Sequence, residues 1–245
     1  LVAAFRKAMN APDHAQYLHW GATSQDIMET GLALRLRRVT QIWDERLGDL
    51  IAALGRLARR HAALPMAART YGQAATPTSF GAVVAGWGHP LIRHRARLAE
   101  VRAGLATVSL GGAAGTLSAM GPQGPEVRAG LAQALDLADP GHSWHAERDR
   151  MGAFAAWMAG LAASLGKMGE DLILMTQTGI NEIRLKGAGG SSTMPQKQNP
   201  VAPSVLVALA RQAVALAGAI QGAGLHRQQR DGAASVSYTH LRAHE

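Results

Sequence analysis

One segment of the chain carries residue types that could move a proton next to a carboxylate. It runs from Gly189 to Pro200 and reads GGSSTMPQKQNP. A serine hydroxyl is a weak base, but a nearby ammonium group and the backbone N–H groups at a helix start can stabilise its alkoxide. The same donors can hold a carboxylate and the added charge of an enolate-like intermediate. A plain Gly/Ser linker fits this composition equally well, so the residues alone leave both interpretations open.

A second polar segment lies immediately before a long apolar-periodic stretch. It runs from His19 to Asp26 and reads HWGATSQD. Thr23 followed three residues later by Asp26 is typical of a helix capping box. Hydroxyl and N–H donors at a helix start can also hold a carboxylate. Thr23 and Ser24 are therefore candidate caps and candidate carboxylate ligands, and the two roles do not exclude each other.

A third segment, from Ala68 to Gly81, contains a tyrosine between polar neighbours and reads ARTYGQAATPTSFG. Tyr71 can donate a proton, although its ordinary pKa near 10 suits that role poorly at neutral pH. A packed and hydrogen-bonded tyrosine is an equally good interpretation of the same residue.

The elements that must position these segments are helices. Apolar residues recur with a 3.6-residue period in five stretches. We expect a long helix that begins at Thr23–Asp26 and is closed by Pro65, followed by helices over Thr78–Leu105, Pro125–Leu137, Asp149–Gln177 and Pro200–Gly222. The last two are apolar nearly all round, which predicts burial in a bundle or between subunits. No useful strand alternation is visible, so the predicted fold class is all-α with a long-helix bundle.

Composition excludes several kinds of site. The chain has no cysteine, which rules out disulfides and cysteine-ligated metals and is compatible with the cytoplasmic location that we expect. We predict no metal site, because His89 and His94 are five residues apart, whereas one helix face needs a spacing of three or four. No apolar run reaches the roughly 18 residues of a membrane span, so no membrane partner is expected.

The net charge of +8 permits two interpretations. One is nucleic-acid binding and the other is an arginine-rich helical surface, and the second is favoured because the arginines are spread along helices without interleaved aromatic residues. Nucleic acid is therefore not an expected partner. A net positive charge also suits a polycarboxylate substrate.

Both ends of the chain differ from its middle in residue pattern. Leu1 lies inside an apparent helix, and the stretch SVSYTHLRAHE, from Ser235 to Glu245, has no helical apolar period. We expect a partial chain, with residues 1–15 as the remnant of an N-terminal helical domain, 16–234 as the catalytic helical bundle and 235–245 as a non-native tail.

The proton-transfer segment resembles the signature loop of the fumarase/aspartase superfamily, GSSxMPxKxNP. Every fixed position of that pattern is matched between Gly190 and Pro200. The resemblance implies that Ser191 is the base that removes a proton next to a carboxylate, with Lys197 and Asn199 stabilising the resulting charge. Ser192 and Met194, in the same loop, become candidate substrate-binding residues.

The other segments resemble the same superfamily. HxGxTSxD is similar to a region of adenylosuccinate lyases and carboxymuconate cycloisomerases, which implies that Thr23 and Ser24 bind a substrate carboxylate and meet the serine loop of another subunit. In many lyase members a general-acid histidine follows the Arg-Thr pair, where this chain has Tyr71. Thr70 and Gln73, on either side of it, are candidate substrate-binding residues.

Two further features complete the set of site candidates. The stretch WHAERDR resembles the cycloisomerases and makes His145 a candidate substrate contact, although Asp149 in the same stretch can simply cap a helix. Arg230 is a possible carboxylate ligand where the match to the superfamily ends.

The resemblance implies a homotetramer that needs no cofactor, acts on a small polycarboxylate and builds each active site from three subunits. The carboxymuconate cycloisomerase branch is favoured, because replacement of the histidine by Tyr71 suits a reaction with no amine leaving group. The implied reaction is the reversible addition of a carboxylate to a carbon–carbon double bond. Three alternatives stay open: an adenylosuccinate lyase or other amine-eliminating lyase, a helical scaffold without activity, and a basic nucleic-acid-binding protein.

Overall fold

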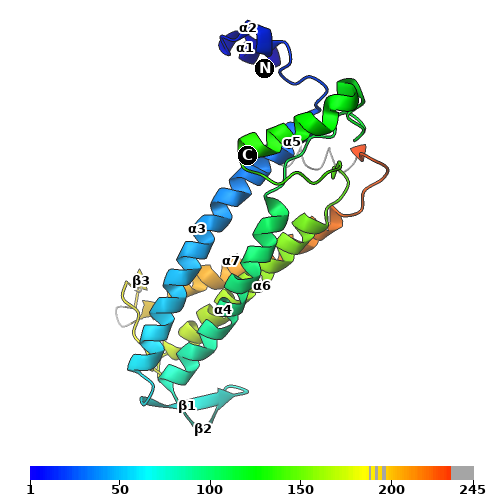
Figure 1. Cartoon of the computed structure of the whole chain (residues 1–245). Helices are drawn as coiled ribbons and strands as arrows, with labels where there is room; N and C mark the ends of the chain where they lie inside the picture. The colour runs from blue at the N-terminus through cyan, green and yellow to red at the C-terminus, as the bar shows by residue number, and fades with distance from the viewer. Residues whose placement is uncertain (188, 191–192, 195–196, 233–245) are drawn as a thin grey trace. The chain divides into compact units, whose positions relative to one another are not determined.

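A computed structural model of the chain describes residues 1–187, 189–190, 193–194 and 197–232 (Figure 1). Helices dominate these residues, as predicted for an all-α protein. Their bounds are α1 (Val2–Ala8), α2 (Pro12–Ala15), α3 (Ser24–Arg60), α4 (Phe80–Leu105), α5 (Gly124–Leu135), α6 (Asp149–Met175) and α7 (Val201–Gly222), with a 3-10 helix η1 at Ser118–Gln123. Each of the five predicted helices is confirmed, with ends that differ by a few residues.

The sequence shows no useful strand alternation, but two strands do form between the first two long helices. Strands β1 (Pro65–Thr70) and β2 (Gln73–Ser79) form an antiparallel hairpin there. Tyr71 and Gly72 make its two-residue turn, with φ angles of 51° and 73°. Positive φ at both central positions is the conformation of a type I′ turn, whose twist matches that of the paired strands. Glycine adopts a positive φ without steric cost.

Contacts divide the chain into two compact units, which are described separately. Unit 1 comprises Leu1–Thr40, Arg102–Met151 and the described residues from Gly222 onward, and unit 2 comprises the described residues of Gln41–Val101 and Gly152–Gln221. Both units therefore contain discontinuous stretches of sequence. The boundaries predicted after residues 15 and 234 stay predictions.

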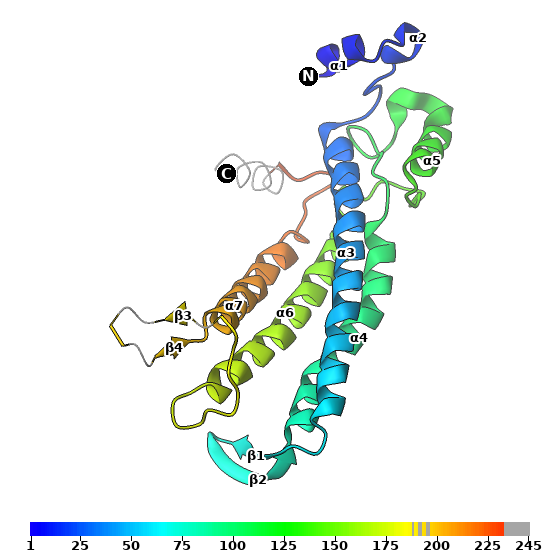
Figure 2. The ribbon, with the colours of Figure 1, turned by 90° about the vertical axis from the view of Figure 1, so that its left-hand side faces the viewer.

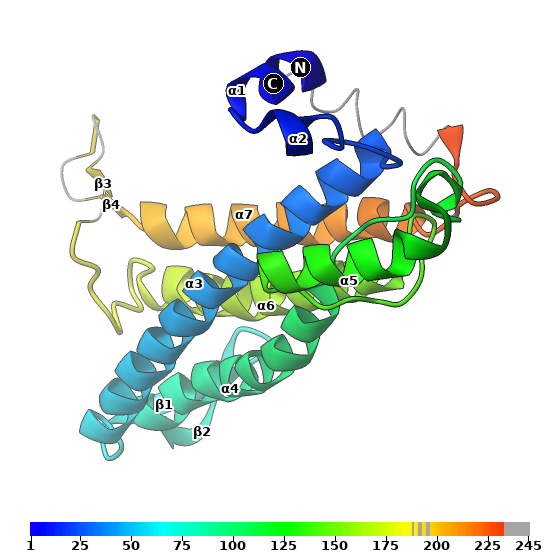
Figure 3. The ribbon, with the colours of Figure 1, turned by 45° about the horizontal axis from the view of Figure 1, so that its top comes forward.

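Unit 2 is a bundle of antiparallel helices. Its core gathers Leu54 of α3, Val84, Trp87 and Leu91 of α4, and Met175 of α6. Helices α6 and α7 run alongside each other (Figures 2 and 3). They approach closely because small residues face each other: a Cβ added at Gly166 would lie 2.7 Å from the Cβ of Ala210. The short strands β3 (Gly189–Gly190) and β4 (Gln198–Asn199) pair just before α7.

Unit 1 has a smaller apolar core. It is formed by Ala33 of α3, Val108, Ala132 of α5, and Leu137. Val108 is joined to the segment after α5, because its N–H donates to the carbonyl of Ala138 at 2.9 Å. This core holds the first turns of α3 beside Gly111 and Gly112, which follow α4.

Helix α7 was expected to be buried in a bundle or between subunits, and within the single chain it is buried only in part, at Pro203, Val207 and Ala210. Val205, Leu209 and Leu216 are 51%, 58% and 56% exposed, so much of its apolar surface is uncovered in the single chain. By length and composition alone α7 is apolar enough to cross a membrane, which corrects the prediction that no stretch qualifies. A helix that packs inside a soluble assembly meets the same criterion.

Candidate active site

The start of α3 in unit 1 is built around the predicted capping box. The Asp26 carboxylate accepts the backbone N–H of Thr23 at 2.9 Å, which satisfies one of the free donors of the helix end. Ser24 is the first residue of the helix and is exposed to solvent. The local sequence therefore places the hydroxyl groups of Thr23 and Ser24 at the positive end of a 37-residue helix.

Asp26 does more than cap the helix. It is 1% exposed and also accepts the backbone N–H groups of Gly111 at 2.9 Å and Gly112 at 3.0 Å. The Nε2 atom of His145 lies 2.6 Å from its Oδ1. Burial raises the pKa of the Asp26 carboxyl, but the hydrogen bonds from His145 and the three backbone donors outweigh burial and hold that pKa below its ordinary value.

A second buried carboxylate, Glu29, lies one helical turn further along α3. It forms an ion pair with Arg148 and accepts the Gln25 side-chain amide at 2.9 Å. The Ser109 hydroxyl is 3.3 Å from both Glu29 and Asp26 and links the two carboxylates. The guanidinium of Arg148 lies over the ring of Trp144 at 5.7 Å. Buried charges are tolerated here because each one has a partner of opposite charge or several donors.

His145, predicted as a substrate contact, lies inside this network. Its residue is 2% exposed, and its Nε2 atom is committed to Asp26. Its carbonyl accepts the side-chain amide of Gln25 at 3.0 Å. The role of His145 as a substrate ligand stays a prediction. The structure places the His145 side chain in the interior, bonded to Asp26 in the first turn of α3.

Two other predicted residues meet at the edge of the network. Arg230 donates from Nη1 to the Thr23 hydroxyl at 2.8 Å, although the two are 207 positions apart in sequence. A guanidinium beside a hydroxyl at a helix N-terminus can bind a carboxylate, because all three supply positive charge or hydrogen-bond donors.

The β1–β2 hairpin in unit 2 carries a second set of candidates. Thr70 and Gln73 pair across the turn, and Tyr71 at its tip is 103% exposed. Arg69, next to Thr70, forms an ion pair of 2.6 Å with Glu182 in the segment that leads to β3. This ion pair connects the hairpin to the stretch that precedes the signature loop.

The signature loop, from Gly190 to Pro200, begins in β3 and includes β4. Asn199 pairs with Gly189 in that short ribbon, Lys197 and Met194 are exposed, and the Lys197 N–H donates to the Met194 carbonyl at 2.9 Å. Ser191 and Ser192 lie outside the described residues. The sequence-predicted site thus falls into a set in unit 1 (Thr23, Ser24, His145, Arg230) and a set in unit 2 (Thr70, Tyr71, Gln73, Met194, Lys197, Asn199).

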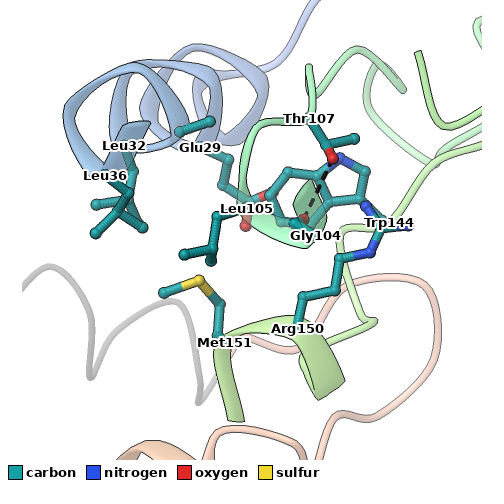
Figure 4. Close-up of a pocket in the computed structure, with 10 residues that line it drawn as sticks. Glu29, Leu32, Leu36, Gly104, Leu105, Thr107, Trp144, Arg150 and Met151 are labelled. Atoms are coloured by element: carbon teal, nitrogen blue, oxygen red, sulfur yellow. Dashed lines mark hydrogen bonds between the residues drawn. The ribbon is translucent and has the colours of Figure 1, made fainter. Parts of the chain in front are cut away.

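A pocket in unit 1 borders the network of buried charges. Figure 4 shows Glu29 and Trp144 at its wall with Arg150 nearby. The remaining wall is mainly apolar: Leu32, Ala33, Leu36, Leu105 and Met151. An apolar pocket does not suit a polycarboxylate, so it is not the predicted substrate site. Among the described residues, no group of three or more His, Cys, Asp or Glu could hold a metal ion.

Comparison with known proteins identifies the family. The family model described as Lyase matches residues 2–215. A 3-carboxy-cis,cis-muconate cycloisomerase of Pseudomonas aeruginosa is 45% identical over 221 residues, which are 88% of this chain and 48% of that protein. One of Pseudomonas putida is 43% identical over 215 residues, 86% of this chain and 51% of that protein.

The crystal structure of a 3-carboxy-cis,cis-muconate lactonizing enzyme from Pseudomonas putida has the same fold. It superposes with a TM-score of 0.90 at 39% identity, over 98% of this chain and 55% of that one. The chain belongs to the lyase family. The resemblance to the fumarase/aspartase superfamily is thereby confirmed. This lyase chain spans about half the length of the curated relatives that it matches.

Sequence reasoning on this lyase missed the importance of Asp26. Its capping position was predicted, but its other donors come from residues about 85 and 119 positions later in the chain. The signal available in the sequence was the pair Gly111–Gly112, since Gly112 has a φ of 73° and an added Cβ there would lie 2.7 Å from the carbonyl oxygen of Gly21. That close approach explains why only glycine fits beside the start of α3.

Proposed function

We propose that the protein is a cofactor-independent 3-carboxy-cis,cis-muconate cycloisomerase, which forms 4-carboxymuconolactone in the breakdown of protocatechuate. The observation that carries this proposal is the similarity to proteins of that name at 43–45% identity over 86–88% of the chain. The signature loop and the paired Thr23 and Arg230 give the similarity a chemical basis.

The proposed reaction is an isomerisation, so its atoms balance without a co-reactant. A carboxylate oxygen of the substrate forms a bond to one carbon of a double bond, and the electron pair of that double bond moves to the neighbouring carbon. The adjacent carboxylate spreads this charge as an enolate-like intermediate, which then takes a proton. In the reverse direction a base removes the same proton. Ser191 is the proposed proton carrier.

The residues around the reacting carbon have electrostatic roles in this proposal. The ammonium of Lys197 and the amide of Asn199 stabilise the developing charge, where preorganised donors are most effective. The other substrate carboxylates are held by donors from the start of α3, the hairpin and the two further candidates in the signature loop: Thr23, Ser24, Thr70, Tyr71, Gln73, Ser192, Met194 and Arg230.

We also propose that the protein assembles as a homotetramer, with each active site shared by three subunits, and acts in the cytoplasm. The exposed apolar residues of α7 support assembly, because a soluble single chain rarely leaves such a surface uncovered. The distribution of candidate residues between two units of one chain is compatible with sites that are completed by neighbouring chains.

The experiment is a direct comparison of substrates. The purified protein should consume 3-carboxy-cis,cis-muconate and should not cleave adenylosuccinate. Consumption is monitored as the loss of the diene absorbance of the substrate. Activity on adenylosuccinate alone would replace the proposal with the amine-eliminating alternative. Absence of activity on both, from a protein that is folded and assembled, would favour the scaffold alternative.

A further inference from the structure

We propose that Asp26 and His145 are positioning residues that hold the Thr23–Ser24 turn in place for a substrate carboxylate. The inference rests on the proposed function, since it assumes that this turn binds a carboxylate. In this proposal neither side chain touches the substrate, because both are almost fully buried, and the positioning role replaces the predicted role of His145 as a substrate ligand. They would act through the backbone and side chains that they hold.

The Asp26 carboxylate joins three stretches that are distant in sequence. Its Oδ2 atom accepts the N–H groups of Thr23 and Gly112 at 2.9 and 3.0 Å. Its Oδ1 atom accepts the Gly111 N–H at 2.9 Å, the His145 Nε2 atom at 2.6 Å and the Ser109 hydroxyl at 3.3 Å. A simple helix cap needs only the first of these bonds.

The surrounding contacts leave this network little room to adjust. A Cβ added at Gly111 would lie 3.1 Å from Cε1 of His145 and 2.9 Å from Cβ of Ser143. A Cβ added at Gly21, two residues before Thr23, would lie 2.9 Å from Cγ of Met120. The turn is therefore packed on one side and held by Asp26 on the other, as a precise binding geometry requires.

Both oxygens of Asp26 accept from at least two groups, and this makes Asp26→Asn informative. Whichever way the asparagine amide turns, its NH₂ group faces backbone N–H donors and at least one of the hydrogen bonds to Thr23, Gly111 or Gly112 is lost. The same substitution also removes a negative charge next to the proposed carboxylate site. A purely electrostatic role therefore predicts tighter substrate binding, and a positioning role predicts weaker binding.

His145 provides a second, independent variant. The Nε2 atom of a glutamine occupies nearly the same place as the Nε2 atom of histidine and can donate to Asp26, whereas leucine cannot. His145→Gln should therefore recover most of the substrate affinity that His145→Leu loses. A histidine that transferred a proton would not be replaced by glutamine, because an amide does not titrate.

The experiment measures kcat and KM for 3-carboxy-cis,cis-muconate together with hydrogen exchange of the Thr23, Gly111 and Gly112 amides. Asp26→Asn should raise KM at least about tenfold and change kcat less than about threefold. It should also speed exchange at these amides. The control is Asp49→Asn, which removes the same charge from an exposed position of the same helix and should leave both measurements unchanged.

Several outcomes would overturn the inference. These are a KM for Asp26→Asn equal to or below the wild-type value, a loss confined to kcat, or unchanged exchange at the three amides. If Asp26→Asn does not fold, equal KM values for His145→Gln and His145→Leu would overturn it instead. Absence of wild-type turnover refutes the proposed function rather than the network, and exchange then decides whether Asp26 holds these segments together.

Discussion

Gly81, the last residue of the segment that begins at Ala68, offers a sharp test of the packing in unit 2. A Cβ added at this position would lie 2.7 Å from Cα and 2.8 Å from N of Ala62, and closer still to the carbonyl oxygen of Ala58. The Gly81 N–H also donates to the carbonyl of His61 at 3.0 Å. The end of α3 and the start of α4 thus approach through backbone atoms, which cannot rotate away as a side chain can.

The expected effect of Gly81→Ala follows from these contacts. Overpacking a buried position costs about 1–3 kcal/mol, and contacts with rigid backbone place this case at about 3 kcal/mol. For a protein of this size, each kcal/mol lowers the midpoint of thermal unfolding by about 2–4 °C, so the midpoint should fall by about 6–12 °C. The β1–β2 hairpin connects these two helix ends, so Thr70 and Gln73 should also be displaced.

The matched control lies on the same helix. Gly86 is exposed, and a Cβ added there meets no atom within 4 Å. Gly86→Ala should raise stability by about 0.5–1 kcal/mol, because alanine favours a helix over glycine. Thermal unfolding followed by circular dichroism at 222 nm measures both variants. Equal midpoints for the two would refute the close approach of the helices at Gly81.

Three further predictions concern the buried charges and the assembly. Arg148→Leu leaves the Glu29 carboxylate buried without its ion-pair partner and should lower the free energy of unfolding in urea by about 3–5 kcal/mol, whereas a loss below about 1 kcal/mol would contradict the network. Burial, with two neighbouring arginines, lowers the pKa of His94, so the folded state binds a proton less readily than the unfolded chain. Stability should therefore decline as the pH falls below about 6.5, and a His94→Gln variant that keeps the same decline would exclude this residue as its source. Leu209→Lys places a charge on the exposed face of α7 and should reduce the mass measured by light scattering, while an unchanged mass would argue against assembly through this face.

The helices were predictable because periodicity and helix-end signals agree in this sequence. The capping role of Asp26 and the end of α6 near Gln177 follow from local residues, and the structure bears them out. Long apolar-periodic stretches make such predictions reliable even without knowledge of their neighbours.

The hairpin was not predictable by the same reasoning. Strands β1 and β2 are rich in alanine and contain Pro65 and Pro77, which are poor strand formers. The first turn residue is Tyr71, whereas Asn, Asp or Gly is the usual signal for this turn. The tertiary connection between the ends of α3 and α4 determines the pairing.

The candidate site was predictable in part, for a related reason. Thr23 and Arg230 were both named from the sequence, but their contact spans 207 positions and depends on the fold of unit 1. His145 was expected at the substrate, whereas its buried position includes a hydrogen bond to Asp26, which lies 119 positions earlier in the chain. Local motifs indicate which residues are chemically suited, and only the fold determines which of them meet.

The most direct test of the central claim is the turnover of 3-carboxy-cis,cis-muconate by a Ser191→Ala variant. Ser118→Ala, at an exposed serine of η1, serves as the matched control, and circular dichroism with light scattering verifies fold and assembly in both variants. If Ser191 carries the proton, kcat falls by at least about a hundredfold in Ser191→Ala and stays at the wild-type value in Ser118→Ala. A folded and assembled Ser191→Ala variant that turns over the substrate at the wild-type rate would contradict the proposed mechanism.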